Sequence, residues 1–382
     1  MSQTATDNPN GRTISVRATQ PRHRILSLDA FRGATIALMI FMDHPTFPAG
    51  IPLFLRHPEW HGFRLPDYVF PAFIFIAGVS MAYSTRKRDV SFAKSTAGFA
   101  RREVLLFALG LMLNYFKYGL PLRIMGVLQR IALSMAIVWP FTRLKARWAV
   151  IGAAVLLVGY AAIFLFAAPA GIPAGSTSAA PNITGWVDTT LLGLEHTYKQ
   201  SGLDPEGLLG TLPAAALGLI GLAMGLRLID RPQDPLELLL IGSYGAALVG
   251  IALWAHRFIP INKKLWTSSF TLVSAGLSLV VLAVLYYLVD IRGYTRGAKW
   301  FVPLGRNALF IYIASNMLVV AGKQWITVDF EGTSTSLWVA VSTALARVVG
   351  LGGASLVISA AEVVLWLGVA ALMHRRKWHV KL

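Results

Sequence analysis

Residues 66–84 read PDYVFPAFIFIAGVSMAYS, a run in which Asp67 is the only charged side chain. About 20 mostly apolar residues in helical form are enough to cross the hydrocarbon core of a bilayer. Apolar windows like 66–84 recur along the whole chain, at 31–48, 103–119, 123–141, 147–168, 207–226, 236–255, 266–289, 303–322 and 354–372. A less apolar run at 337–350 is interrupted by Arg347 and predicts an interfacial or re-entrant helix. We therefore predict an all-α polytopic membrane protein with about ten transmembrane helices.

The composition supports a membrane protein and limits its chemistry. Of the 382 residues, 55% are hydrophobic and 14% are charged, and the mean hydropathy is +0.59, values that soluble domains seldom reach. The formal net charge of +17 is explained by Lys and Arg in cytoplasmic loops, so we do not expect nucleic acid as a partner. The absence of cysteine excludes disulfides, iron–sulfur clusters and thiolate catalysis, and any metal would need His and carboxylate ligands.

The distribution of the 35 Lys and Arg residues predicts the orientation. Of these, 23 lie in the two terminal segments and in the loops at 86–102, 143–147, 227–235 and 290–306, and Arg32 at the adjoining end of the first span makes 24. By the positive-inside rule, both termini are cytoplasmic. Residues 1–24 then form a basic, flexible cytoplasmic tail rather than a signal peptide, and residues 25–382 form a single integral membrane domain. The long loop at 169–206 lies on the outer side, where its aromatic and acidic residues favour a structured lid.

A cluster of titratable residues lies on the outer side, between the first two predicted spans. Residues 55–71 read LRHPEWHGFRLPDYVFP and contain His57, Glu59, Trp60, His61 and Asp67. His57 and His61 are four residues apart, as in helical zinc sites, but Pro58 stands where such a motif carries Glu. A general base is the better interpretation, because the unperturbed pKa of histidine lies near working pH and Asp67 could fix the tautomer. The alternative is an ordinary solvated loop with an interfacial tryptophan.

Two further pairs occupy the ends of the first predicted span. Asp29 and Arg32 are three residues apart on one helix face, which favours a structural ion pair. Asp43 and His44 end the same helix on the outer side, where the helix dipole disfavours a carboxylate unless a cation is near. This second pair is either a solvated helix terminus or part of a functional site.

Polar residues beside other spans indicate an anionic partner. The run RIMGVLQR at 123–130 places Arg123 at the outer start of a span and Gln129 and Arg130 deeper in it. An arginine at that depth needs an anion such as phosphate, or an acidic side chain. Lys263 and Lys264 interrupt the charge bias of the outer side, and either an anionic ligand or lipid headgroups would satisfy them.

Six blocks of the chain, in the same order, resemble the heparan-α-glucosaminide N-acetyltransferase family of transmembrane acetyltransferases. They are SLDAFRGATIALMIFMDHP, LRHPEWHGFRLPDYVFPAFIFIAGVS, RIMGVLQR, DPEGLLGTL, IPINKKLW and NALFIYI, and the match runs from about Arg24 to Val380. The resemblance implies transfer of an acetyl group from acetyl-CoA, as co-substrate, to the amino group of a terminal glucosamine. It also implies that the acceptor lies on the side of the membrane away from the cytoplasm.

The resemblance also implies roles for single residues. The family's essential histidine falls on His57, its active-site asparagine on Asp43 and its acid on Asp67. Asp43 is a departure, since a carboxylate accepts a hydrogen bond from the amine or from His57 where an amide would donate one to an oxyanion. Ser315 and Asn316 also depart from the His and Glu of the lysosomal enzyme. The candidates for binding CoA are Arg32, Arg123, Gln129, Arg130, Lys263 and Lys264. The candidates for contacting the acceptor are His44, Glu59, Trp60 and His61.

We therefore predict an acetyl-CoA-dependent N-acetyltransferase of the bacterial inner membrane, in contact with lipids and without a metal. His57 acts as general base for direct attack by the amine, or it takes the acetyl group first and passes it on with ping-pong kinetics. The alternative from another class is an inner-membrane carrier or binding protein for amino sugars or N-acetylglucosamine. A weaker alternative is a metallohydrolase built on His57 and His61. The natural acceptor and the formation of a homodimer are left open by the sequence.

Overall fold

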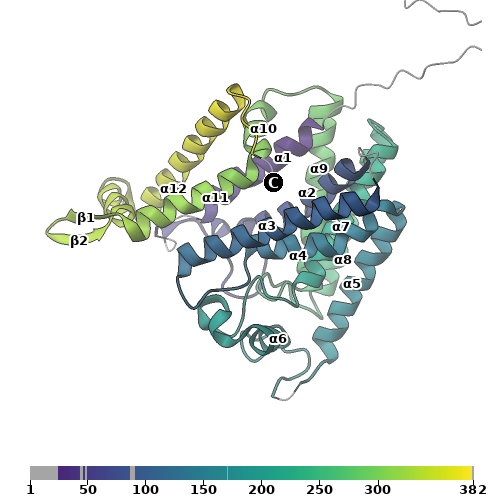
Figure 1. Ribbon diagram of the computed structural model, residues 1–382, viewed down its shortest axis with the longest axis horizontal. Helices are drawn as coiled ribbons and strands as arrows, with labels where there is room; N and C mark the ends of the chain where they lie inside the picture. Colours follow the sequence, from purple (N-terminus) through teal and green to yellow (C-terminus); the bar gives the residue numbers. More distant parts are fainter. Residues whose placement is uncertain (1–24, 44–45, 48–49, 87–90, 170, 381–382) are drawn as a thin grey trace, which may run out of the picture.

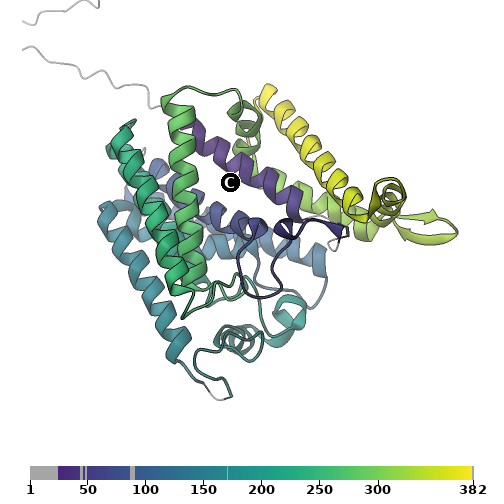
Figure 2. The ribbon, with the colours of Figure 1, turned by 180° about the vertical axis from the view of Figure 1, so that it is seen from behind.

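The computed structural model describes residues 25–43, 46–47, 50–86, 91–169 and 171–380. In this part of the chain the structure is a helical bundle with one small hairpin (Figures 1 and 2), so the prediction of a mainly helical fold is confirmed. The helices are α1 (Leu26–Asp43), α2 (Leu65–Arg86), α3 (Phe92–Tyr118), α4 (Val127–Val138), α5 (Ala146–Phe166), α6 (Ile183–Leu192), α7 (Thr211–Asp230), α8 (Pro235–Ala255), α9 (Ser268–Leu285), α10 (Ala298–Arg306), α11 (Ala308–Val320) and α12 (Leu337–Arg375). Turns of π-helix extend α9 over Tyr286–Ile291 and α11 over Ala321–Trp325.

Six of the described helices are long and apolar enough to cross a membrane. They are α2, α5, α7, α8, α9 with its extension, and α12, and the bent pair α10–α11 makes a seventh if it is counted as one span. The helices α1, α3 and α4 coincide with predicted spans but fall short of the same test, and α4 has only 12 residues. Several apolar membrane-crossing helices are thus present, while the count of ten and the position of the termini stay predictions.

Three segments differ from the spans that the sequence predicts. The span expected at 303–322 is broken at Asn307, where α10 and α11 meet at 83°. The run at 337–350 and the span at 354–372 form one element, α12, which breaks at Gly350, where a φ of 74° favours glycine. Between α11 and α12 lies an unexpected hairpin of β1 (Thr327–Phe330) and β2 (Thr333–Ser336), which projects from the bundle in Figure 1. Its two-residue turn, Glu331 and Gly332, has positive φ at both positions, as tight hairpins require.

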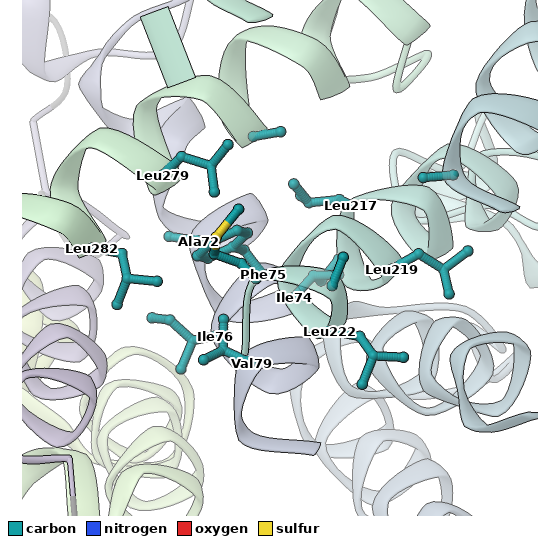
Figure 3. Packing of buried hydrophobic residues seen from close by; sticks show 14 of the residues in the cluster. Ala72, Ile74, Phe75, Ile76, Val79, Leu217, Leu219, Leu222, Leu279 and Leu282 are labelled. Atoms are coloured by element: carbon teal, nitrogen blue, oxygen red, sulfur yellow. The ribbon is translucent and has the colours of Figure 1, made fainter. Parts of the chain in front are cut away.

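The core lies where α2 packs along α7, and glycines bring these helices together. A Cβ on Gly78 would lie 2.0 Å from the carbonyl oxygen of Gly218, and one on Gly221 would lie 2.3 Å from that of Phe75. Small residues allow membrane helices to approach this closely. Apolar side chains of α2, α7 and α9 fill the space around the contact (Figure 3), among them Ile74, Phe75, Leu217, Leu219, Leu222 and Leu279.

The loops of the bundle lie at its two opposite ends. At the end predicted to be cytoplasmic, Asp290 accepts hydrogen bonds from the backbone N–H groups of Leu26 and Ser27, and Arg86 pairs with Asp230 at 3.1 Å. Hydrogen bonds at the opposite end join the segment before α2 to the segment before α9, and the segment before α4 to the loop before α7. This second end therefore gathers the polar residues that the sequence analysis selected on the outer side.

Candidate active site

His57 and Asp67 form a hydrogen-bonded pair at the start of α2. His57 Nδ1 lies 2.7 Å from Asp67 Oδ1. The Asp67 side chain is 1% exposed, whereas the His57 side chain is 46% exposed. A carboxylate can only accept, so His57 donates from Nδ1 and carries its lone pair on Nε2. The pair thus holds an accessible imidazole in the tautomer that a general base needs.

The beginning of α2 explains why Asp67 is so well placed. Asp67 stands at the third position of the helix, and its Oδ2 accepts a hydrogen bond of 3.0 Å from the backbone N–H of Arg64. This is the reciprocal contact of a capping box, in which an acid in the first turn satisfies a donor at the helix start. The guanidinium of Arg64 in turn donates to the carbonyl oxygen of His57 at 3.3 Å. One carboxylate therefore caps the helix and orients the histidine.

The turn before α9 packs against this pair. Lys263 Nζ lies 3.6 Å from Asp67 Oδ1 and 3.5 Å from the carbonyl oxygen of Pro66. Asn262 donates from Nδ2 to the carbonyl oxygen of Trp60 at 3.0 Å, and its Oδ1 accepts from the backbone N–H of Leu265 at 2.9 Å. Two segments about 200 residues apart in the sequence are thereby fixed against each other.

The three predicted acceptor contacts that lie in described residues surround the same turn. Glu59 and His61 are exposed, and Lys264 donates to the carbonyl oxygen of Glu59 at 2.9 Å. The Lys264 ammonium also lies 5.3 Å from the centre of the Trp60 ring. Although His61 is exposed, partial desolvation of its ring, with a smaller contribution from His256, lowers its pKa, which favours its neutral form. His44, the fourth predicted contact, lies outside the described residues.

Arg123 is held by acidic side chains of the loop before α7. Its Nε and Nη2 donate to the two carboxylate oxygens of Asp204 at 2.8 and 2.6 Å, and Nη2 also donates to Glu206 at 2.5 Å. Rings of Tyr118 and Tyr198 flank the guanidinium, with centres 5.5 and 4.6 Å away. Acidic side chains from another segment therefore balance the charge of Arg123.

Glu206 lies among several cations. Burial disfavours its ionised form, but Arg123 and Arg130 outweigh burial, and Lys263 adds to them, so the pKa of Glu206 is lowered. A buried carboxylate that stays ionised needs such partners, since desolvation alone would neutralise it. Because Lys263 also contacts Asp67, Glu206 is electrostatically linked to the His57 pair.

Arg130 is almost fully buried in α4. Its Nη2 donates to the carbonyl oxygen of Gly207 at 2.6 Å, and its guanidinium lies 4.7 Å from the centre of the Trp266 ring. Among the described residues, Arg130 Nε and Nη1 and Gln129 Nε2 have no hydrogen-bond partner. The charge of Arg130 is balanced electrostatically by Glu206, Asp204 and Asp188, which again favours acidic partners.

Arg32 lies far from the His57 pair, and Asp43 lies at the end of α1 without a hydrogen bond to it. Arg32 donates to Ser80 Oγ at 2.5 Å and lies 3.5 Å from Asp29. Ser80 follows Asp67 by 13 residues on α2, or about 20 Å along a helix. Asp43 is exposed at the end of α1. It interacts electrostatically with Lys117 and Tyr312 and shares no hydrogen bond with His57.

Several residues near the site were missed as site candidates. Glu206 stands in the block DPEGLLGTL, which served only to support the family resemblance, and its central place follows from the fold of a distant loop. His256, whose Nδ1 accepts from the backbone N–H of Ile261 at 2.9 Å, carried no sequence signal. Lys117 and Tyr312 likewise carried no sequence signal, because only the fold brings α3 and α11 beside the end of α1. Within the described part of the chain, no group of three or more His, Asp or Glu side chains is arranged to hold a metal ion.

The resemblance to an enzyme family is confirmed by comparison with known proteins. Residues 24–193 match the family model described as heparan-alpha-glucosaminide N-acetyltransferase, catalytic. The chain is 27% identical over 409 residues to the heparan-alpha-glucosaminide N-acetyltransferase of Homo sapiens, covering 88% of this chain and 60% of the human protein. It is 26% identical over 397 residues to that of Mus musculus, covering 85% and 59%. The chain thus spans about three fifths of the length of these relatives.

Proposed function

We propose, from this similarity and from the geometry at the start of α2, that the protein is a transmembrane N-acetyltransferase. It moves an acetyl group from acetyl-CoA to the amino group of a glucosamine-type sugar on the outer side of a bacterial inner membrane. The observation that carries the proposal is the His57–Asp67 pair, an exposed imidazole oriented by a buried carboxylate at 2.7 Å. The matched residues 24–193 contain this pair.

The proposed reaction requires little beyond positioning and a base. The amine of the acceptor attacks the thioester carbonyl carbon, a C–N bond forms, the C–S bond breaks, and CoA leaves as a thiolate. His57 Nε2 removes a proton from the attacking nitrogen, which would otherwise stay an unreactive ammonium. Asp67 stabilises the imidazolium that results. A positioned base contributes roughly 10² to 10⁴-fold to the rate, and holding the two substrates together contributes the remainder.

The other candidate residues support binding to different degrees. Lys264 is an exposed cation beside Trp60 and is suited to an anionic group such as a CoA phosphate. Arg123 and Arg130 already have acidic partners, so their first role is to shape the loop before α7. Glu59, Trp60 and His61 surround the place where an acceptor sugar would approach His57, and Asp43 would act from the end of α1.

A transfer assay tests the proposal. Detergent-purified protein is incubated with radiolabelled acetyl-CoA and glucosamine, and labelled N-acetylglucosamine is measured. His57→Ala is expected to lower the rate by about 10² to 10⁴-fold, while His379→Ala, which changes an exposed histidine near the carboxyl end, retains it. Absence of transfer by a protein that binds acetyl-CoA would overturn the enzyme assignment.

The same preparation separates the two chemical routes. If His57 carries the acetyl group, acetyl-CoA alone releases about one equivalent of CoA and leaves label on the protein, as expected for a covalent intermediate. Direct attack instead releases CoA only when the amino sugar is present. Label retained on the His57→Ala variant would contradict an acetyl-histidine.

A carrier for amino sugars is the second candidate, and one observation favours it. The pair α10–α11 is broken by 83° within what would be one span, and discontinuous helices are common in transporters. Uptake of labelled glucosamine into proteoliposomes in the absence of acetyl-CoA tests this function directly. Uptake without any acetyl transfer would favour the carrier over the enzyme.

A further inference from the structure

His57 and Lys263, which can both carry a positive charge, lie beside the same oxygen of the buried Asp67 carboxylate. His57 Nδ1 lies 2.7 Å from Asp67 Oδ1, and Lys263 Nζ lies 3.6 Å from the same atom. The carboxylate is 1% exposed and the Lys263 side chain is 22% exposed. At such separations and with limited access to water, charges interact strongly enough to shift protonation equilibria.

The Lys263 ammonium is held against the start of α2 by two contacts. In addition to Asp67 it contacts the carbonyl oxygen of Pro66 at 3.5 Å, and it interacts electrostatically with Glu206 in the loop before α7. The turn that carries it is tied down by Asn262, whose backbone N–H donates to Thr267 Oγ1 at 3.1 Å. A lysine that contacts a buried carboxylate and a backbone carbonyl, on a turn tied down in this way, has little freedom to swing toward another ligand.

We propose, resting on the role of His57 as the base, that Lys263 is a positioning residue that keeps the His57 imidazole neutral while Asp67 orients it. A lone buried carboxylate stabilises an imidazolium and would hold the proton on the ring before the amine arrives. An ammonium on the same oxygen offsets that attraction without breaking the orienting hydrogen bond. Lys263 therefore separates the two effects of Asp67, orientation and charge.

The other charged groups near His57 do not replace this contribution. Arg64, from the same segment, donates to the His57 carbonyl oxygen at 3.3 Å. Lys264, from the turn before α9, is directed to the Glu59 carbonyl oxygen, and His61 faces Asn262 at 3.4 Å and is influenced by His256. Lys263 alone among these groups contacts the carboxylate oxygen that His57 uses.

Direct titration of His57 tests the proposal. Histidine-labelled protein in detergent is titrated by NMR, and the His57 signal is assigned by its loss in His57→Gln. Lys263→Met is expected to raise the titration midpoint of His57 by about one pH unit, whereas Lys263→Arg and the neighbouring Lys264→Gln leave it within a few tenths. An unchanged midpoint in Lys263→Met would overturn the proposal.

A kinetic measurement adds a readout that a structural role would not move. The acid limb of the profile of kcat against pH is expected to shift upward by the same unit in Lys263→Met, with KM for acetyl-CoA unchanged. A raised KM with an unshifted limb would assign Lys263 to CoA binding instead. If Lys263→Met does not fold, Lys263→Gln against Lys263→Arg gives the same comparison. The NMR titration needs no turnover, so it tests Lys263 independently of the transfer assay. If the midpoint of His57 shifts but the protein transfers no acetyl group, the proposed function is refuted and the role of Lys263 stands.

Discussion

The two members of the His57–Asp67 pair differ in burial, and this difference suits them to different roles. Asp67 is buried at the start of α2, where it satisfies a backbone donor as well as the imidazole. His57 is in a loop and keeps nearly half of its side chain exposed. A residue that must meet a substrate needs access, and a residue that orients it needs rigidity. The pairing of these residues was foreseeable from the sequence because Asp67 opens a strongly apolar helix only ten residues after His57.

Asp188, in the outer loop, makes the stability of the protein depend on pH. Burial raises its pKa from an ordinary value of 3.8 to about 6, although it accepts hydrogen bonds from the backbone N–H groups of Leu208 and Asp204. Between these two pH values the folded protein binds more protons than the unfolded chain, so this contribution to stability is greatest at low pH and falls as pH rises toward about 6.

The Asp188 dependence is measured by thermal unfolding in detergent. The apparent Tm of the native protein is expected to fall between pH 4.5 and 6.5 by more than that of Asp188→Asn, which cannot ionise. Both proteins share every other titrating group, so the difference between the two slopes isolates Asp188. Parallel slopes would show that this carboxyl is not perturbed by burial.

At the scale of elements, Arg123 joins the start of α4 to the loop before α7. Its removal in Arg123→Ala leaves Asp204 and Glu206 buried without their main cation, which is expected to reduce stability by about 3 to 5 kcal/mol. The double variant Arg123→Met with Asp204→Leu replaces the pair by apolar groups of similar size and should recover much of that loss. Apparent Tm values of the three proteins check this, and a single variant as stable as the native protein would contradict it.

The contact of α2 with α7 depends on glycine. Gly78→Ala places a methyl group 2.0 Å from the carbonyl oxygen of Gly218, so the helices must separate, at a cost of about 1 to 3 kcal/mol. Gly159→Ala in α5 is the matched control, because a Cβ there meets nothing within 4 Å, and it is expected to be neutral or stabilising. Equal Tm values for the two variants would argue against close packing of α2 on α7.

Sequence reasoning located most long elements but not their interruptions. Apolar runs such as 66–84 have one physical explanation, so α2 and its neighbours were predictable. The bend at Asn307 and the hairpin at 327–336 result from tertiary packing and local turn chemistry, which hydropathy does not encode. Within the site, Glu206 was not predictable as a central residue because its cations come from two other segments, and only the fold brings them together.

At the scale of the whole molecule, the two ends of the bundle differ in charge. The end predicted to be cytoplasmic carries most of the Lys and Arg, and the opposite end carries the His57 pair and its loops. The predicted orientation rests on this separation, and with the proposed function it means that acetyl-CoA is supplied from the cytoplasm and the acceptor from outside. The site would then bring together substrates from two compartments.

The orientation is testable because the chain contains no cysteine. Single cysteines are introduced as Glu195→Cys, in the outer loop, and Tyr294→Cys, between α9 and α10, both at exposed positions. A membrane-impermeant maleimide added to spheroplasts is expected to label only the first, and inverted vesicles should label only the second. The reverse pattern would show that the bundle is inserted the other way round, and the native chain serves as a blank.

Trp60 connects three segments that are distant in the sequence. Its indole N–H donates to the carbonyl oxygen of Thr177 at 2.6 Å, its ring lies beneath Lys264, and its carbonyl oxygen accepts from Asn262. Because all three contacts meet at one residue, we expect the three segments to open as one cooperative unit. Their amide hydrogens should then exchange with solvent at a common rate. An acceptor that needs more room would displace all three segments in one concerted step.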